Sequence, residues 1–108
     1  MEKYEQIAFQ IITNVGMAKS TYMQAIQEAK SNNFNDSYDL VEEGNKYLTE
    51  GHKVHKDLIQ SESAGEEIKL NLLLVHAEDQ LISTEIIKEM AKELIYVHEN
   101  YIKSNFRN

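Results

Sequence analysis

The 108-residue chain contains no cysteine, no proline and no tryptophan, and it has only four glycines. The lack of cysteine excludes disulfides, thiolate metal sites and a cysteine nucleophile within this sequence. The lack of proline removes the residue that most strongly interrupts a helix, so long helices are favoured. No apolar run approaches the roughly 20 residues that a helix needs to cross a bilayer, and residues 1–4, MEKY, are not typical of a signal peptide. We therefore expect a cytoplasmic protein that does not insert into a membrane.

Positive charge is also scarce. The chain has 11 basic and 18 acidic residues, which gives a formal net charge of −7. Binding to nucleic acid depends on clustered lysine and arginine, and no such cluster is present, so nucleic acid is not an expected partner. The same shortage argues against docking to an anionic membrane surface.

Apolar residues recur at helical spacing in three segments, which predicts helices over approximately residues 2–30, 35–60 and 67–101. The predicted apolar face of the first helix consists of Tyr4, Ala8, Ile11, Val15, Ala18, Tyr22, Ala25 and Ala29. Residues 31–33, Ser-Asn-Asn, and Gly65 are typical of the turns that would separate them. Long helices joined by short connections fold as antiparallel neighbours. We therefore predict an all-α, up-down-up three-helix bundle that forms a single domain over residues 1–108.

The third predicted helix carries two apolar stripes. The first consists of Leu73, Ala77, Leu81, Thr84, Ile87, Ala91 and Leu94. The second consists of Leu72, Val75, Asp79, Ile82, Ile86 and Met90. One stripe can pack against the other two helices of the same chain, and the other requires a different partner. Further copies of the chain around a symmetry axis are the simplest partner, so we predict a homo-oligomer.

Three glycines fall inside predicted helices, where each costs about 1 kcal/mol relative to alanine. Gly44 and Gly51 lie seven residues apart and therefore on one face of the second helix. We expect this cost to be offset by the close approach of another helix at both positions. Gly16 either plays the same part in the first helix or leaves open space beside a functional group.

The segment Leu70–Glu85 places His76 and Asp79 among residues that are otherwise strongly apolar. A buried charge costs several kcal/mol unless it is paired, coordinated or neutralised. His76 is a core residue hydrogen-bonded to a neighbour, a metal ligand or a nucleophile; the first is the most frequent role for a single histidine among leucines. Gln80 stands four residues later, where a zinc site would place a second histidine, which weakens the zinc alternative.

Asp79 lies in the middle of the second stripe. If that stripe surrounds a three-fold axis, three carboxylates converge, and each pair repels by about 3 kcal/mol at ~5 Å and an effective dielectric of ~20. A hard cation such as Mg²⁺, which prefers carboxylate and water oxygens, would cancel this repulsion. The alternative is that Asp79 faces solvent through a break in the stripe.

Three ordered segments resemble motifs of one protein family. Residues 75–84, VHAEDQLIST, resemble the VHAQDHLMTS signature of the lactose/cellobiose-type IIA proteins of the bacterial phosphoenolpyruvate-dependent sugar phosphotransferase system. Residues 16–20, GMAKS, resemble the family segment G-[DE]-A-R-S, and residues 50–59, EGHKVHKDLI, resemble its run E-A-H-x-x-Q-T-x-L-I. The small residues at 63–65 match the turn before the third helix. The resemblance covers nearly the whole chain.

This resemblance implies a homotrimer of three-helix subunits, nine helices in total. It implies that His76 accepts a phosphoryl group from the phosphocarrier HPr as a tele-phosphohistidine and passes it to a cysteine of the cognate IIB component. The membrane component IIC then takes part only indirectly, in the uptake of a disaccharide of the cellobiose, chitobiose or lactose class. It also implies that Asp79 lies at the trimer axis and that three copies share one structural Mg²⁺. The chain would thus be a phosphotransferase component, a phosphoprotein of sugar transport.

The chain departs from the family pattern near the expected phosphoryl site. Gln80 replaces the family's second histidine, and it can donate a hydrogen bond to a phosphoryl oxygen but supplies no charge. Lys19 replaces arginine, which keeps the positive charge and loses the bidentate geometry. Lys19, Ser20, Gln80 and His52 are candidate neighbours of the phosphoryl group. For His52, and more strongly for His55, the alternative is a half-buried helix residue with its polar tip at the surface.

Two other functions compete with the phosphocarrier role. A histidine-phosphotransfer domain of two-component signalling is also helical and has one reactive histidine, but that class carries HxxKG, and residues 76–80, HAEDQ, lack both the lysine and the glycine. A trimeric helical interaction module with a structural histidine is the second alternative, and it predicts no uptake of phosphate.

Overall fold

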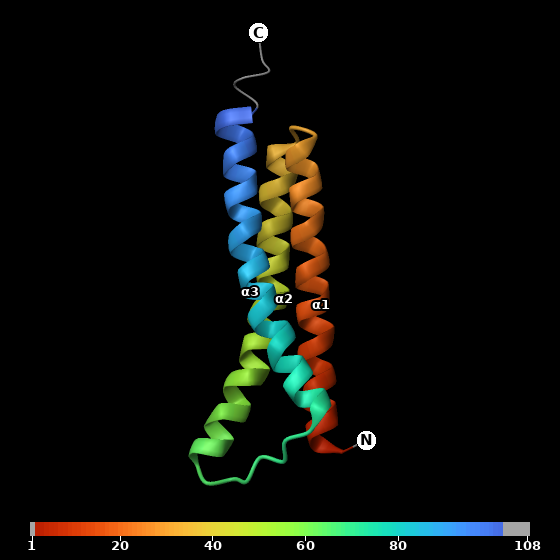
Figure 1. The fold of residues 1–108 in the computed structure, drawn as a ribbon, viewed down its shortest axis with the longest axis vertical. Coiled ribbons are helices and arrows are strands. Elements are labelled where there is room, and N and C mark those ends of the chain that lie inside the picture. Colours follow the sequence, from red (N-terminus) through yellow and green to blue (C-terminus); the bar gives the residue numbers. More distant parts are fainter. Residues whose placement is uncertain (1, 103–108) are drawn as a thin grey trace.

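The computed structural model describes residues 2–102 and shows three long helices and a short turn at the end of the third. Helix α1 spans Lys3–Lys30, α2 spans Phe34–Ser63 and α3 spans Leu72–Val97, followed by the π-helical turn η1 at His98–Ile102. Figure 1 shows that α1 and α3 run in the same direction and α2 runs in the opposite one. The all-helical up-down-up architecture is therefore confirmed. The rod measures 62 × 24 × 20 Å.

The turns between the helices lie where the polar residues and the glycine were expected. After α1, Asn32 has a φ of 64°, a left-handed conformation that asparagine tolerates better than most residues. After α2, Gly65 has a φ of 98°, where a side chain would be strained. No helix within residues 2–102 is long and apolar enough to cross a membrane.

The third helix begins at Leu72 and not near residue 67, so the expected start was wrong by about one turn. Asn71 caps this helix: its side-chain oxygen accepts a hydrogen bond from the backbone N–H of Leu74 at 2.8 Å. Apolar Ile68 and Leu70 continue the helical spacing backwards into the connection, which is why periodicity alone placed the start too early.

The non-helical connection before α3 is tied to the first turn of α1. Lys3 Nζ donates to a carboxylate oxygen of Glu66 at 2.6 Å, and the Tyr4 hydroxyl donates to the backbone carbonyl of Glu67 at 3.1 Å. The hydrogen bond from Lys3 lowers the pKa of the Glu66 carboxyl group. These contacts hold the connection across the end of the bundle, so α3 enters beside α1.

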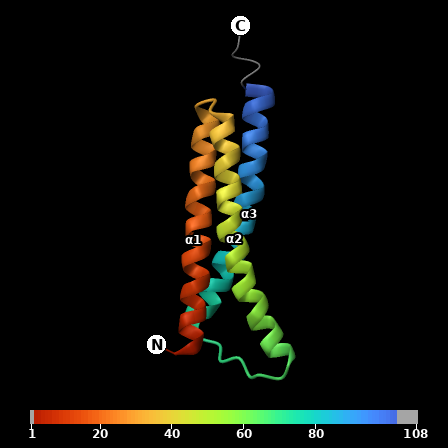
Figure 2. The same cartoon turned by 180° about the vertical axis from the view of Figure 1, so that it is seen from behind.

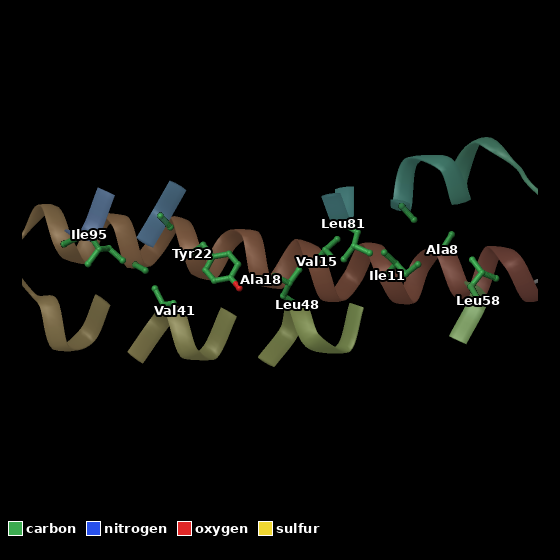
Figure 3. Packing of buried hydrophobic residues seen from close by; sticks show 14 of the residues in the cluster. Ala8, Ile11, Val15, Ala18, Tyr22, Val41, Leu48, Leu58, Leu81 and Ile95 are labelled. Carbon is green, nitrogen blue, oxygen red and sulfur yellow. The ribbon is translucent and has the colours of Figure 1, made fainter. Parts of the chain in front are cut away.

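The core follows one face of α1, and every apolar position predicted for that face beyond Tyr4 is buried: Ala8, Ile11, Val15, Ala18, Tyr22, Ala25 and Ala29. Figure 3 shows Val41 and Leu48 of α2 packed on one side of this line, and Leu81 of α3 on the other. Tyr22 is the largest fully buried side chain, and its hydroxyl donates to Asn45 Oδ1 at 2.7 Å. Burial raises the pKa of Tyr22 to about 12.

The predicted close approach at Gly44 and Gly51 is confirmed. An added Cβ would lie 2.6 Å from Cε1 of Tyr22 at Gly44, and 2.9 Å from Cγ1 of Val15 at Gly51. At Gly16 no atom lies within 4 Å of an added Cβ, so this glycine borders open space. The two α2 glycines thus allow the aromatic and branched side chains of α1 to reach the axis of the bundle.

Alanine substitutions at Gly44 and Gly16 are expected to change the free energy of unfolding in opposite directions. Gly44→Ala is expected to lower the free energy of unfolding by about 1–3 kcal/mol, because the added methyl group overpacks a ring that its hydroxyl hydrogen bond holds in place. Gly16→Ala is expected to raise it by up to about 1 kcal/mol through helix propensity alone. Urea unfolding followed by circular dichroism measures both. A neutral Gly44→Ala variant would show that Tyr22 can shift without cost.

Candidate functional site

His76 lies on the outer face of α3 with an exposed side chain. The alternative of a buried, structural core histidine is therefore wrong for the single chain. Among residues 2–102, no side chain donates to or accepts from the His76 ring. No side chain of the described residues therefore fixes the ring, which is open to an approaching partner, and the α3 backbone fixes only the point from which the side chain projects.

Gln80 is the predicted neighbour that the structure places on the same face of α3 as His76. It lies one turn further along the helix, where residues four apart face each other at the helix surface. Its side chain is partly buried, so the amide is more restricted than one on a free surface. It is the candidate best placed to reach a group attached to the His76 ring.

Lys19 and Ser20 lie further along the bundle. Val15 and Leu81 are at the same level, because both contact the Cβ position of Gly51. Lys19 is four residues beyond Val15, His76 is five residues before Leu81, and α1 and α3 run in parallel (Figure 1). Nine residues of helix rise by about 13 Å. Within one chain, the structure therefore does not bring Lys19 or Ser20 to the His76 ring.

His52 pairs with α3 at a different level from His76. Its Nε2 atom forms an ion-pair contact with Glu85 Oε1, nine residues beyond His76 on the same helix. His55, one turn further along α2, forms a second such contact: its Nδ1 atom lies 2.6 Å from Oε2 of Glu78. Sequence reasoning missed both partners, because residues 23 and 33 positions apart have no periodic relation in the sequence.

The second apolar stripe of α3 is exposed, as expected for a face without a partner in its own chain. Leu72 is 84% exposed, Val75 52%, Ile82 58%, Ile86 61% and Met90 55%. Monomeric proteins seldom expose a continuous row of large apolar side chains of this kind, which indicates an interaction surface. The exposed stripe (these five residues with Asp79) runs along most of α3.

Asp79 lies in the exposed stripe and is itself exposed. One chain cannot supply a complete metal site here, because residues 2–102 contain no group of three or more His, Asp or Glu side chains placed to hold an ion. A single carboxylate on a surface that is otherwise apolar fits a site shared between copies. Carboxylate oxygen is also the ligand type that Mg²⁺ prefers.

A hollow of about 330 Å³ lies between the C-terminal half of α2 and the start of α3. Figures 1 and 2 show α2 diverging from α3 at this end of the rod. Apolar side chains from both helices form most of its walls, and the His55–Glu78 pair lies at its edge. Val75 belongs both to this hollow and to the exposed stripe.

The chain is similar to known proteins of one family. Residues 6–99 match the family described as "PTS system, Lactose/Cellobiose specific IIA subunit". The chain is 38% identical over 98 residues to the lichenan-specific phosphotransferase enzyme IIA component of Bacillus subtilis, an alignment that covers 91% of this chain and 89% of that protein.

Two solved structures are similar along nearly the whole chain. The crystal structure of the cellobiose-specific enzyme IIA from Bacillus anthracis is 36% identical in sequence to this chain, with a TM-score of 0.89. The alignment covers 92% of this chain and 91% of the chain in that structure. The solution structure of the IIA(chitobiose)–HPr complex of the Escherichia coli phosphotransferase system is 30% identical, with a TM-score of 0.77, and covers 92% of this chain and 96% of that one.

Proposed function

Because the chain belongs to the lactose/cellobiose-specific IIA family and is therefore a IIA component of the phosphotransferase system, we propose that it carries phosphoryl groups on His76. The phosphoryl group comes from phospho-HPr and goes to a cysteine of a cognate IIB component, in the cytoplasm. The observation that carries the proposal is the exposed His76 ring within the segment that resembles the family signature. Incubation with phosphoenolpyruvate, enzyme I and HPr, followed by intact-mass measurement, tests it.

In the proposed transfer, the protein mainly positions the reacting groups and stabilises the charge on the phosphoryl group. A neutral imidazole attacks the phosphorus of phospho-HPr with its Nε2 lone pair, so an N–P bond forms on His76 as the donor's N–P bond breaks. In the second step the thiolate of IIB attacks, and an S–P bond forms as the His76 N–P bond breaks. The exposed ring suits a group that must meet two different proteins in turn.

Gln80 is proposed to donate a hydrogen bond to a phosphoryl oxygen on His76, because the two side chains share a face of α3. Lys19 and Ser20 remain candidates at the site, and their exposure on α1 favours contact with the docked carrier protein over contact with the phosphoryl group. His52 is left out of the proposed site, because its contact with Glu85 places it nine residues beyond His76 along α3.

Family membership removes the two-component phosphotransfer alternative. The labelling experiment also tests the alternative of a non-catalytic interaction module, which predicts no phosphate uptake. The sugars named for the similar proteins above are lichenan, cellobiose and chitobiose, which share β-linked sugar units. We propose that this chain serves the uptake of a β-linked disaccharide or short oligosaccharide of the same class.

We further propose that three copies assemble around the exposed stripe. The stripe supplies the apolar surface that such an interface needs, and it lies opposite the face of α3 that packs inside the subunit. Three Asp79 carboxylates then meet at the axis and share one Mg²⁺, which would neutralise their mutual repulsion. The ion has a structural role in this arrangement, so His76 is not among its ligands.

Docking of the carrier should depend on ionic strength. The chain has a net charge of −7, and the family resemblance implies a donor, HPr, with a basic or apolar face. Raising sodium chloride from about 50 to about 500 mM is expected to raise the KM for phospho-HPr by about 3- to 10-fold, with little change in kcat, because salt screens exposed charges. Initial rates of turnover, with IIB present to accept the phosphoryl group and phospho-HPr varied, measure both constants. A KM that does not depend on salt would indicate docking by apolar contacts alone.

A further inference from the structure

The His55–Glu78 pair joins α2 and α3 beside the segment that carries His76. The Nδ1 atom of His55 lies 2.6 Å from Oε2 of Glu78, and the two side chains are 34% and 28% exposed. Such partial burial removes part of the water that weakens ion pairs on open surfaces. Nδ1 of His55 is buried and has no hydrogen-bond partner among the described residues, so the pair is a close imidazole–carboxylate contact and not a hydrogen bond.

Both members of this pair replace a glutamine of the family motifs. The run that residues 50–59 resemble has glutamine at position 55, and the signature that residues 75–84 resemble has glutamine at position 78. The structure shows that these two departures, 23 residues apart, contact each other. Two glutamines of the family motifs are thus replaced in this chain by an imidazole and a carboxylate that lie in contact.

The contact lies where apolar packing between the two helices is interrupted. The hollow of about 330 Å³ separates the end of α2 from the start of α3, and His55 and Glu78 are among its lining residues. Glu78 is only two residues beyond His76, whose ring has no hydrogen-bond partner within residues 2–102. The point from which the His76 side chain projects therefore depends on how the first turns of α3 are held.

We propose that His55 and Glu78 act as a coupled pair of positioning residues, which holds the α3 turn that presents His76 to the phosphoryl donor. The proposal rests on the proposed phosphocarrier function. Neither residue touches the phosphoryl group. They act through the backbone between Glu78 and His76.

A double-mutant cycle tests the coupling, with His55→Gln, Glu78→Gln and the double variant that restores the family pair. Each single variant is expected to lower kcat for labelling by about 3- to 10-fold at an unchanged KM for phospho-HPr, because a misdirected ring affects transfer and not docking. The double variant is expected to return to within about 2-fold of the parent, since coupled neighbours do not add. Glu85→Gln, which removes the similar contact with His52, is the matched control and should leave kcat unchanged.

The outcomes separate this proposal from the function on which it rests. If the parent chain takes up no phosphate, the phosphocarrier function fails. If the parent is labelled and the single variants have the same kcat as the parent, the positioning role fails. It also fails if the kcat of the double variant is lower than that of both single variants. An equal fall in kcat for Glu85→Gln and Glu78→Gln would also overturn the positioning role. In that case any contact between α2 and α3 would affect transfer, and the His55–Glu78 contact would have no special part. If a single variant unfolds, the double variant decides between the two results. A kcat that recovers to the parent's value supports the coupled pair, and a kcat that stays low rejects it.

Discussion

His76→Ala is expected to abolish phosphoryl uptake completely. The parent chain should gain one acid-labile phosphate per subunit when incubated with phosphoenolpyruvate, enzyme I and HPr, and the variant should gain none. Loss of a nucleophile that forms the covalent intermediate typically costs several orders of magnitude in rate. Because the His76 side chain is exposed and makes no hydrogen bond within residues 2–102, its removal should leave the melting temperature nearly unchanged.

The chain offers a matched control in His98, one of its four histidines, which lies in the η1 turn at the far end of α3. His98→Ala should be labelled to the same extent as the parent. Intact-mass measurement before and after brief acid treatment identifies phosphohistidine, since its N–P bond is acid-labile and a phosphoserine is not. Full labelling of His76→Ala would reject the assignment of the acceptor and point to another histidine.

Asp79→Leu is expected to raise the melting temperature by about 5 °C or more and to remove any dependence on Mg²⁺. Without Mg²⁺, the three carboxylates of the proposed trimer repel by about 3 kcal/mol per pair at ~5 Å and an effective dielectric of ~20, so the gain is largest against the metal-free parent. Leucine would extend the apolar row between Val75 and Ile82 and remove the repulsion. For a chain of this length, about 1 kcal/mol changes the melting temperature by roughly 4–8 °C.

Calorimetry with added Mg²⁺ or with a chelator measures this effect, and light scattering after gel filtration gives the number of subunits. Asp79→Asn separates the two causes, because it removes the charge without adding apolar surface and should give a smaller rise. Asp57→Leu, at an exposed position on α2, is the control for a general effect of apolar substitution. A large loss of stability in Asp79→Leu, or a species smaller than a trimer, would contradict the position of Asp79 at a three-fold axis.

The part of the fold that depends on local periodicity could be read from the sequence. The buried face of α1 was predicted nearly residue by residue, because apolar side chains three and four positions apart must share a helix face. The same rule gave two stripes for α3 and so the exposed surface that one chain leaves uncovered. The start of α3 was not predicted, because the Asn71 cap competes with an apolar pattern that continues through Ile68 and Leu70.

At the candidate site, the sequence by itself identified the candidate phosphoryl acceptor, His76, in a segment that resembles the family signature, with Gln80 one turn away. That relation is local and follows from helix geometry. Only the tertiary structure decided how the helices align, which separates Lys19 from His76 by about 13 Å along the rod. It also decided that His55 meets Glu78 and that His52 meets Glu85. Such contacts depend on the relative shift of two packed helices, and that shift is set by the side chains of the whole core, Gly44 and Gly51 included, and not by any short segment.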